Sequence, residues 1–371
     1  MAGLAEEVKR NRWELKAAVE RLMPESRTAT CSRLHLAGHM HDGEFVRSSG
    51  VSIFESDGKT FFSGLETCSS VWACPICAAK ISERRRAELI EMQTRWESAG
   101  GLFRFMTLTF PHHNTDSLSE LMMRFAAAKK RLLQSRTWRA WCRAIGLEHS
   151  ITALEITCGE NGWHIHAHCV LFLRSGCAEC RAEDLLPTWR HCCRAAGLPE
   201  PNSRGLDIRR RSAAVEYVTK WGLDLELTKQ HIKRGRGGHC TPFDLLRAYA
   251  DGSTAAGDLF SEFTRVFKGR RQLVCSPGLR QAMGVQDKSD AQLAEEQQSD
   301  AVLVAVVPVE EWKIVVRYDL RYALLHEARE RGKAGVQEYL ALLVSGESTD
   351  AFLSRVPLPL FDYVEEQYAE L

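Results

Sequence analysis

The sequence contains no hydrophobic run of the ~18 residues that a membrane-spanning helix requires. Its first residues, MAGLAEEVKRNRWELKAAVERLMP, are charged and amphipathic, and they lack the apolar centre of a secretory signal. We therefore expect a cytoplasmic protein with no membrane partner. The chain has 371 residues, of which 44% are hydrophobic and 26% are charged, which is typical of a soluble globular protein with room for two domains.

The chain also has little net charge, +1 at pH 7, but this charge is unevenly distributed. Residues 285–371 contain 8 Lys and Arg against 17 Asp and Glu, which leaves 41 against 31 for residues 1–284. A basic body can attract nucleic acid, whereas an acidic C-terminal segment favours a separate regulatory or packing element.

The patterns predict three successive segments: an N-terminal helix and cysteine-rich segment (1–100), a central domain with a basic extension (101–284), and an acidic accessory segment (285–371). The polar stretch 287–300 is typical of a linker. Periodicity and turn residues predict the individual elements. We expect helices at 4–22, 78–99, 117–145 with a break near Ser135, 185–197 and 212–227, strands at 102–110 and 206–210, and hairpins within 51–64 and 150–173.

Three histidines alternate in the segment 164–168, HIHAH. On a strand such residues share one face, so the three imidazoles line up. Closing the hairpin on the turn 159–162 places Glu155 opposite His166 and Thr157 opposite His164. Nitrogen and oxygen donors in this arrangement suit Mg²⁺, Mn²⁺ or a similar divalent ion.

Thirteen cysteines in a chain without a secretory signal indicate metal ligands or buried thiols before disulfides. Cys74 and Cys77 form a CxxC knuckle, and Cys68 and Cys31 complete the tetrahedral set of a structural Zn²⁺. A second group leaves open whether another zinc site exists, because adjacent cysteines on a helix point in different directions. This group consists of Cys177, Cys180, His191, Cys192 and Cys193.

Tyr217 and Lys220 are three residues apart in a predicted helix, so they share one face. A nearby ammonium or metal ion stabilises a phenolate, which makes such a tyrosine a candidate nucleophile. By itself this spacing is weak evidence, because a tyrosine and a lysine three residues apart on a helix usually only pack against neighbours or contact solvent.

Taken together, several segments resemble the ordered motifs of HUH endonucleases. They are TLTF (107–110), NGWHIHAHCVLFL and the downstream EYVTKW. More narrowly, the chain resembles rolling-circle plasmid replication initiators with a single catalytic tyrosine. CSSVWACPICAAKI is similar to the zinc segment of that family, and TPFDLL, KGRRQL and SPGLR are similar to its later signatures; the resemblance covers about residues 30–284.

This resemblance implies an α+β fold, in which a central antiparallel sheet with flanking helices, of the RRM or ferredoxin-like type, follows an N-terminal zinc-binding β-ribbon. It implies that His166 and His168 bind the catalytic ion, with Glu155 as the acidic ligand and His164 as an auxiliary ligand. Tyr217 matches the nucleophile, and Lys220 its assisting base or phosphate contact.

The implied activity is nicking and rejoining of origin DNA by metal-dependent transesterification, with a 5′-phosphotyrosine intermediate and a free 3′-hydroxyl primer. The implied cofactors are Mg²⁺ or Mn²⁺ and a structural Zn²⁺. The implied partners are single-stranded or hairpin origin DNA and the host helicase and polymerase. Relatives often carry a glutamate one helical turn before the tyrosine, where this chain has Ala213, so the residue that activates water at termination stays open.

Two other interpretations compete with a replication initiator. A transposase or mobilisation relaxase of the HUH type shares the histidines, but such transposases often carry two neighbouring tyrosines, and here the next tyrosine after Tyr217 is Tyr249. A zinc-dependent DNA-binding regulator without catalysis does not require the aligned histidines.

Overall fold

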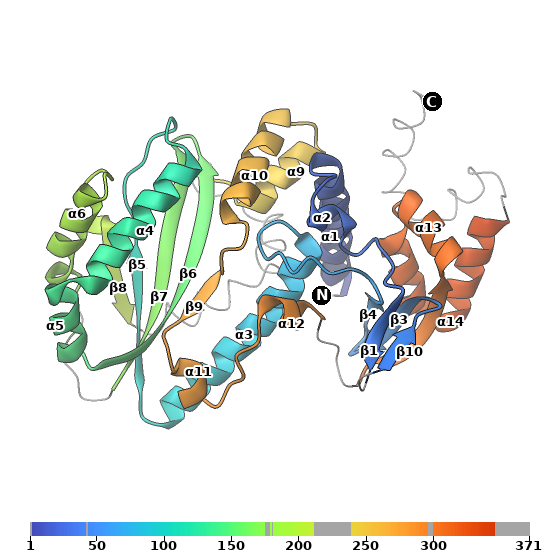
Figure 1. The fold of residues 1–371 in the computed structure, drawn as a ribbon, viewed down its shortest axis with the longest axis horizontal. Coiled ribbons are helices and arrows are strands. Elements are labelled where there is room, and N and C mark those ends of the chain that lie inside the picture. Colours follow the sequence, from blue (N-terminus) through green and yellow to red (C-terminus); the bar gives the residue numbers. More distant parts are fainter. Residues whose placement is uncertain are drawn as a thin grey trace. The chain divides into compact units, whose positions relative to one another are not determined.

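A computed structural model describes residues 2–41, 44–174, 179, 181–210, 239–295 and 300–345 (Figure 1). Contacts divide the chain into two compact units. The first is built mainly from residues 69–294, and the second combines residues 24–68 and part of the first helix with the chain from residue 295 onward. Both contain antiparallel sheets with helices, which confirms the expected α+β class.

The first unit is organised by a five-stranded antiparallel sheet with the order β8-β5-β7-β6-β9. The strands are β5 (Leu102–Leu108), β6 (Leu147–Gly159), β7 (Gly162–Leu173), β8 (Leu206–Arg210) and β9 (Leu273–Cys275). The hairpin β6–β7 has the predicted register, since Glu155 pairs with His166 and Thr157 with His164. Gly162 closes the turn at φ +82°, and a Cβ there would lie 2.9 Å from the Asn114 Cα, so a glycine is required.

Helices cover the two faces of this sheet differently. On one face, α3 (Pro75–Ser98) and α11 (Leu279–Ala282) pack against part of the sheet through an apolar cluster that includes Met92 and Phe172. The other face carries α4 (Leu118–Gln134) and α5 (Arg136–Ala144), and α6 (Leu186–Ala195) packs beside α4 (Figure 1). Ser135 caps α5, because its hydroxyl accepts from the Trp138 amide at 3.0 Å, and this confirms the predicted break.

The remaining described elements of this unit include η1 (Ala182–Asp184), η2 (Ser203–Gly205), α9 (Pro242–Ala250), α10 (Thr254–Phe267) and α12 (Asp290–Glu295). α12 corrects part of the expected linker 287–300. Its Leu293 and Ala294 are buried, and Arg85 forms an ion pair with Asp290. Ser289 caps this short helix through the Gln292 amide, so polar composition here reflects helix capping rather than a free linker.

The second unit combines segments from the N-terminal and C-terminal parts of the chain in one core. Strand β10 (Val302–Pro308) pairs with β3 (Gly50–Ser56), and β3 pairs in turn with β4 (Lys59–Ser63). A separate hairpin joins β1 (Gly38–His41) to β2 (Glu44–Arg47). The helices of this unit are α2 (Arg27–Thr30), α13 (Val309–Arg317), α14 (Arg321–Val344) and the middle part, residues 9–20, of α1 (Ala2–Leu22).

This grouping differs from the three successive segments expected from the sequence. Val51 and Ile53 of β3 are fully buried in one cluster with Val307 and Trp312 of the C-terminal segment. The strand pairing is the physical reason, because β3 buries its apolar face only with the C-terminal elements in place.

Candidate metal centre

Strand β7 presents two different environments on one face. Val170 and Phe172 point into the apolar cluster beneath α3, whereas His166 and His168, further toward the start of the strand, line a cleft of about 530 Å³. Alternation along the strand explains this arrangement, since residues two apart share a face. Among the described residues, α3 therefore covers only part of this face, and the histidine part lines the cleft.

Glu155, His166 and His168 converge in this cleft. Each offers one donor atom, and the three atoms lie within 4.8 Å of one another. The Glu155 Oε2 is 2.8 Å from His168 Nε2 and 3.8 Å from His166 Nδ1. His166 Nδ1 is buried without a hydrogen-bond partner among the described residues, a costly state that a bound cation would relieve. Two imidazoles and a carboxylate thus fit a divalent ion.

Thr107 and Phe105 of β5 fix the orientation of His168. The Thr107 hydroxyl lies 3.2 Å from His168 Nδ1, and the Phe105 ring stacks on the imidazole with a centroid distance of 5.4 Å. β5 pairs with β7 so that Thr107 is directly opposite His168. Such contacts leave Nε2 directed at Glu155 and tune the imidazole as a ligand.

His164 has different contacts. Its Nε2 lies 2.9 Å from the Thr109 hydroxyl, and it is not part of the group that could hold an ion. Burial lowers the pKa of His164 to about 3 and that of His166 to about 4, so both rings are neutral near pH 7. Neutral imidazole is the form that binds metals. The auxiliary role of His164 stays a prediction.

The opposite wall of the cleft consists of residues that sequence reasoning missed: Ser203, Arg204, Asp207 and Arg209. Asp207 pairs with Thr107 across β8 and β5, and it forms an ion pair with Arg209. The alternation in LDIRR indicated that Asp207 and Arg209 share a face, but not that β8 lies beside β5. The wall adds two cations and a second carboxylate to the cleft that already contains Glu155.

Tyr217, Lys220 and Ala213 lie outside the described residues. The chain on either side of them is described, and both sides are close to the histidines. Before them, β8 contributes Asp207 and Arg209 to the cleft. After them, the His239 ring lies 6.0 Å from the His164 ring, and Cys240 forms a β-bridge with Cys158 of β6. Described residues on both sides of the segment that carries Tyr217 thus lie near the three histidines, Asp207 and Arg209 in the cleft and His239 beside His164.

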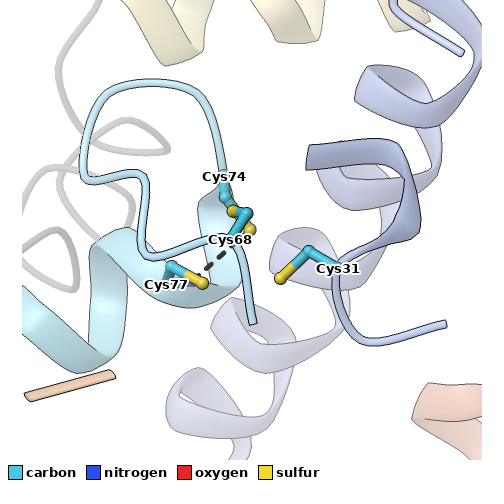
Figure 2. Close-up of side chains that lie close together, drawn as sticks. All are labelled: Cys31, Cys68, Cys74 and Cys77. Carbon is cyan, nitrogen blue, oxygen red and sulfur yellow. Dashed lines mark hydrogen bonds between the residues drawn. The ribbon is translucent and has the colours of Figure 1, made fainter. Parts of the chain in front are cut away.

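Cys31, Cys68, Cys74 and Cys77 form a second group whose sulfur atoms all lie within 4.8 Å of one another. Figure 2 shows Cys74 and Cys77 at the start of α3, with Cys68 and Cys31 directed toward them. Cys74 caps α3, because its Sγ accepts from the Cys77 amide at 3.5 Å, and Pro75 follows at the first helical position. Four thiols in this arrangement fit a tetrahedral zinc ion.

The cysteines and the histidine between residues 177 and 193 do not form a comparable cluster among the described residues. Cys177 and Cys180 lie outside the described residues. Cys192 and Cys193 are buried on α6, His191 is exposed, and burial raises the pKa of the Cys193 thiol to about 12. In the part of the chain that the structure describes, the only groups able to hold an ion are the two above.

Residues 61–319 match the family model Rep_1, described as replication protein. The chain belongs to this replication protein family. The replication protein is also similar to "Protein rep" of Streptomyces lividans, at 27% identity over 82% of this chain and 88% of that protein. A shorter match, at 30% identity, joins 30% of this chain to 31% of a "Neomycin resistance protein" of Streptomyces cyanogenus.

No solved structure matches the replication protein significantly. None of the helices in its described ranges combines the length and the apolar composition needed to cross a bilayer.

Proposed function

We propose that this replication protein initiates rolling-circle replication of a plasmid by nicking and rejoining one strand of origin DNA. The convergence of Glu155, His166 and His168 carries the proposal, together with a buried nitrogen of His166 that has no hydrogen-bond partner among the described residues. Further support comes from the cleft on an antiparallel sheet and from described residues on both sides of the Tyr217 segment, since Asp207 and Arg209 line the cleft and His239 lies beside His164.

The residues take separate roles in the proposed reaction. Glu155, His166 and His168 would hold Mg²⁺ or Mn²⁺, and such an ion would polarise a nonbridging phosphate oxygen and stabilise the charge that develops there. The Tyr217 oxygen attacks the phosphorus in line, and its proton passes to Lys220 in the neutral form or to solvent. The bond from phosphorus to the 3′ oxygen breaks, and that oxygen takes up a proton from Lys220 or from solvent. The products are a 5′-phosphotyrosine and a 3′-hydroxyl.

Other parts of the proposal follow from this reaction. The phosphotyrosine keeps the energy of the phosphodiester, so the strand can be rejoined, while the 3′-hydroxyl can prime a polymerase. Single-stranded or hairpin origin DNA is then the substrate, the host helicase and polymerase are partners, and the cytoplasm is the place of action. The four cysteines would bind a structural Zn²⁺ separate from the catalytic ion.

A covalent-adduct assay tests the proposal. The full-length protein is incubated with Mn²⁺ and a labelled single-stranded origin oligonucleotide, and the products are separated on a denaturing gel. The wild type should form an adduct, and Tyr217→Phe should form none while retaining DNA binding, because the change removes one oxygen and keeps the ring. Tyr249→Phe, a matched change on α9, should form the adduct normally.

An adduct formed by Tyr217→Phe would show that another residue is the nucleophile. Absence of any adduct with the wild type would favour a DNA-binding regulator without catalysis. A transposase or relaxase would also form the adduct, so replication of a plasmid that carries the origin separates those functions from an initiator.

A further inference from the structure

The helices α4 and α5 contain an unusual excess of positive charge. Residues 121–147 include seven Lys and Arg and no Asp or Glu, in a chain with nearly equal totals of 49 and 48. Five of the seven side chains are exposed: Lys130, Arg131, Arg136, Arg139 and Arg143. We call these five residues the α4–α5 basic face.

In the part of the chain that the structure describes, acidic side chains do not neutralise these five cations. In the described ranges none of them forms an ion pair with a carboxylate, whereas Arg124 earlier on α4 pairs with Glu120. Arg139 donates to the Gln134 carbonyl at 2.8 Å, a contact with the end of α4 that leaves its charge uncompensated. Cations held on a folded surface without acidic neighbours create a local positive potential.

The helical spacing directs three of these cations to one side. Arg136, Arg139 and Arg143 are separated by three and four residues, so they share a face of α5. Trp138 and Trp141 lie on the other face and are buried. The apolar residues therefore anchor α5 and leave the arginines directed to solvent.

This face is distinct from the candidate metal centre. Figure 1 shows α4 and α5 on one side of the sheet. Ile165, Ala167 and Leu171 are buried and alternate with Val170 and Phe172, which pack against α3, so they face the side that α4 and α5 cover. His166 and His168 alternate with them and so point to the opposite side. A ligand on the α4–α5 basic face therefore does not compete with a strand bound in the cleft.

The chemistry of the face fits the backbone of double-stranded DNA. Arg136 to Arg143 span about 10 Å along the helix, or about three base pairs of a duplex. Single strands are usually bound by cations interleaved with exposed aromatic rings, on which the bases stack. Here Phe125, Trp138 and Trp141, the aromatic residues of α4 and α5, are all buried.

We propose that the α4–α5 basic face binds the phosphate backbone of double-stranded DNA without regard to sequence. This binding is separate from nicking, and it holds whether or not the cleft cleaves DNA. It gives the protein two nucleic-acid surfaces on opposite sides of one sheet, one for a duplex and one for the strand in the cleft.

The test is a binding titration of the full-length protein with a fluorescent 20-base-pair duplex of arbitrary sequence. The variant Arg136→Gln/Arg139→Gln/Arg143→Gln should lower duplex affinity by between about tenfold and 500-fold at 100 mM salt. It should also reduce the slope of log affinity against log salt by about 2.7, that is about 0.9 for each lost phosphate contact. Lys130→Gln/Arg131→Gln should reduce the slope by about 1.8.

The matched control removes the same charge from exposed cations of the second unit, as Lys313→Gln/Arg317→Gln/Lys333→Gln. It should leave the duplex slope unchanged. If the control and the α5 variant lost equal duplex affinity, the effect would come from net charge alone, and the proposal would be overturned. Weak duplex binding by the wild type, or an α5 variant that loses only single-strand binding, would overturn it as well.

The adduct assay on a single-stranded oligonucleotide keeps the two proposals separate. The α5 variant should form the adduct as the wild type does. A wild type without an adduct would count against nicking, and the duplex titration would still decide the role of the basic face.

Discussion

Replacing Glu155 by Gln tests the candidate metal centre directly. The change keeps the length and shape of the side chain and removes its negative charge. The Glu155 Oε2 lies 2.8 Å from His168 Nε2 and 3.8 Å from His166 Nδ1, so it is the charged member of the three-donor group. Without it, a divalent ion would meet two neutral imidazoles and an amide.

The expected loss of metal affinity follows from these contacts. Loss of a ligand-orienting or coordinating carboxylate typically weakens metal binding by about 10- to 100-fold. This corresponds to about 1.4–2.7 kcal/mol of binding free energy. Free Mn²⁺, measured by electron paramagnetic resonance during a titration of the protein, reports this affinity independently of nicking.

Glu160→Gln is the matched control, because Glu160 is exposed at the turn of the same hairpin and the charge change is identical. The control should bind Mn²⁺ as the wild type does. Wild-type Mn²⁺ affinity in Glu155→Gln would refute the role of this carboxylate as a ligand. Equal losses in both variants would indicate a long-range charge effect instead.

Three further results are expected. Cys74→Ser/Cys77→Ser should lose about one zinc ion per chain in elemental analysis, whereas Cys142→Ser/Cys275→Ser should retain it; full zinc in the first variant would refute the cysteine site. A chain ending at residue 300 lacks the buried Val307, Trp312 and Leu324, so limited proteolysis should cleave residues 50–63 rapidly, and protection there would contradict the shared core. Because burial lowers the pKa values of His164 and His166 to about 3 and 4, the unfolded chain binds protons more readily below about pH 6.5. The metal-free protein should therefore melt at lower temperatures as the pH falls from 6.5 toward 4. A smaller pH slope of the melting temperature in His166→Gln would identify His166 as one cause, whereas an unchanged slope would exclude His166.

Local features of the chain were predictable from the sequence. The β6–β7 hairpin is closed by a short turn, so the sum rule for paired positions placed Glu155 opposite His166 as the structure has it. The break at Ser135 was equally local, because a serine side chain caps the helix that follows it.

Pairings between distant strands were not predictable in the same way. Alternation shows which side chains of a strand share a face, but it does not identify the neighbouring strand. The sequence therefore did not predict the β8–β5 pairing, or the contribution of Asp207 and Arg209 to the cleft that results from it. The β10–β3 pairing was not predicted for the same reason, so the C-terminal segment was expected to form a separate element.

The pairing of β3 with β10 also bears on synthesis of the protein at the ribosome. β3 ends at Ser56 and β10 begins at Val302, so the partner strand is translated roughly 250 residues later, on the order of 10–50 s at usual elongation rates. Until then, β3 and β4 form at most a two-stranded hairpin, which is marginally stable in water and leaves Val51 and Ile53 uncovered. A nascent or prematurely terminated chain thus exposes the unpaired edge and the apolar side chains of β3, which chaperones and proteases can recognise. Once β10 has been translated, it can pair with this edge and help to bury these side chains.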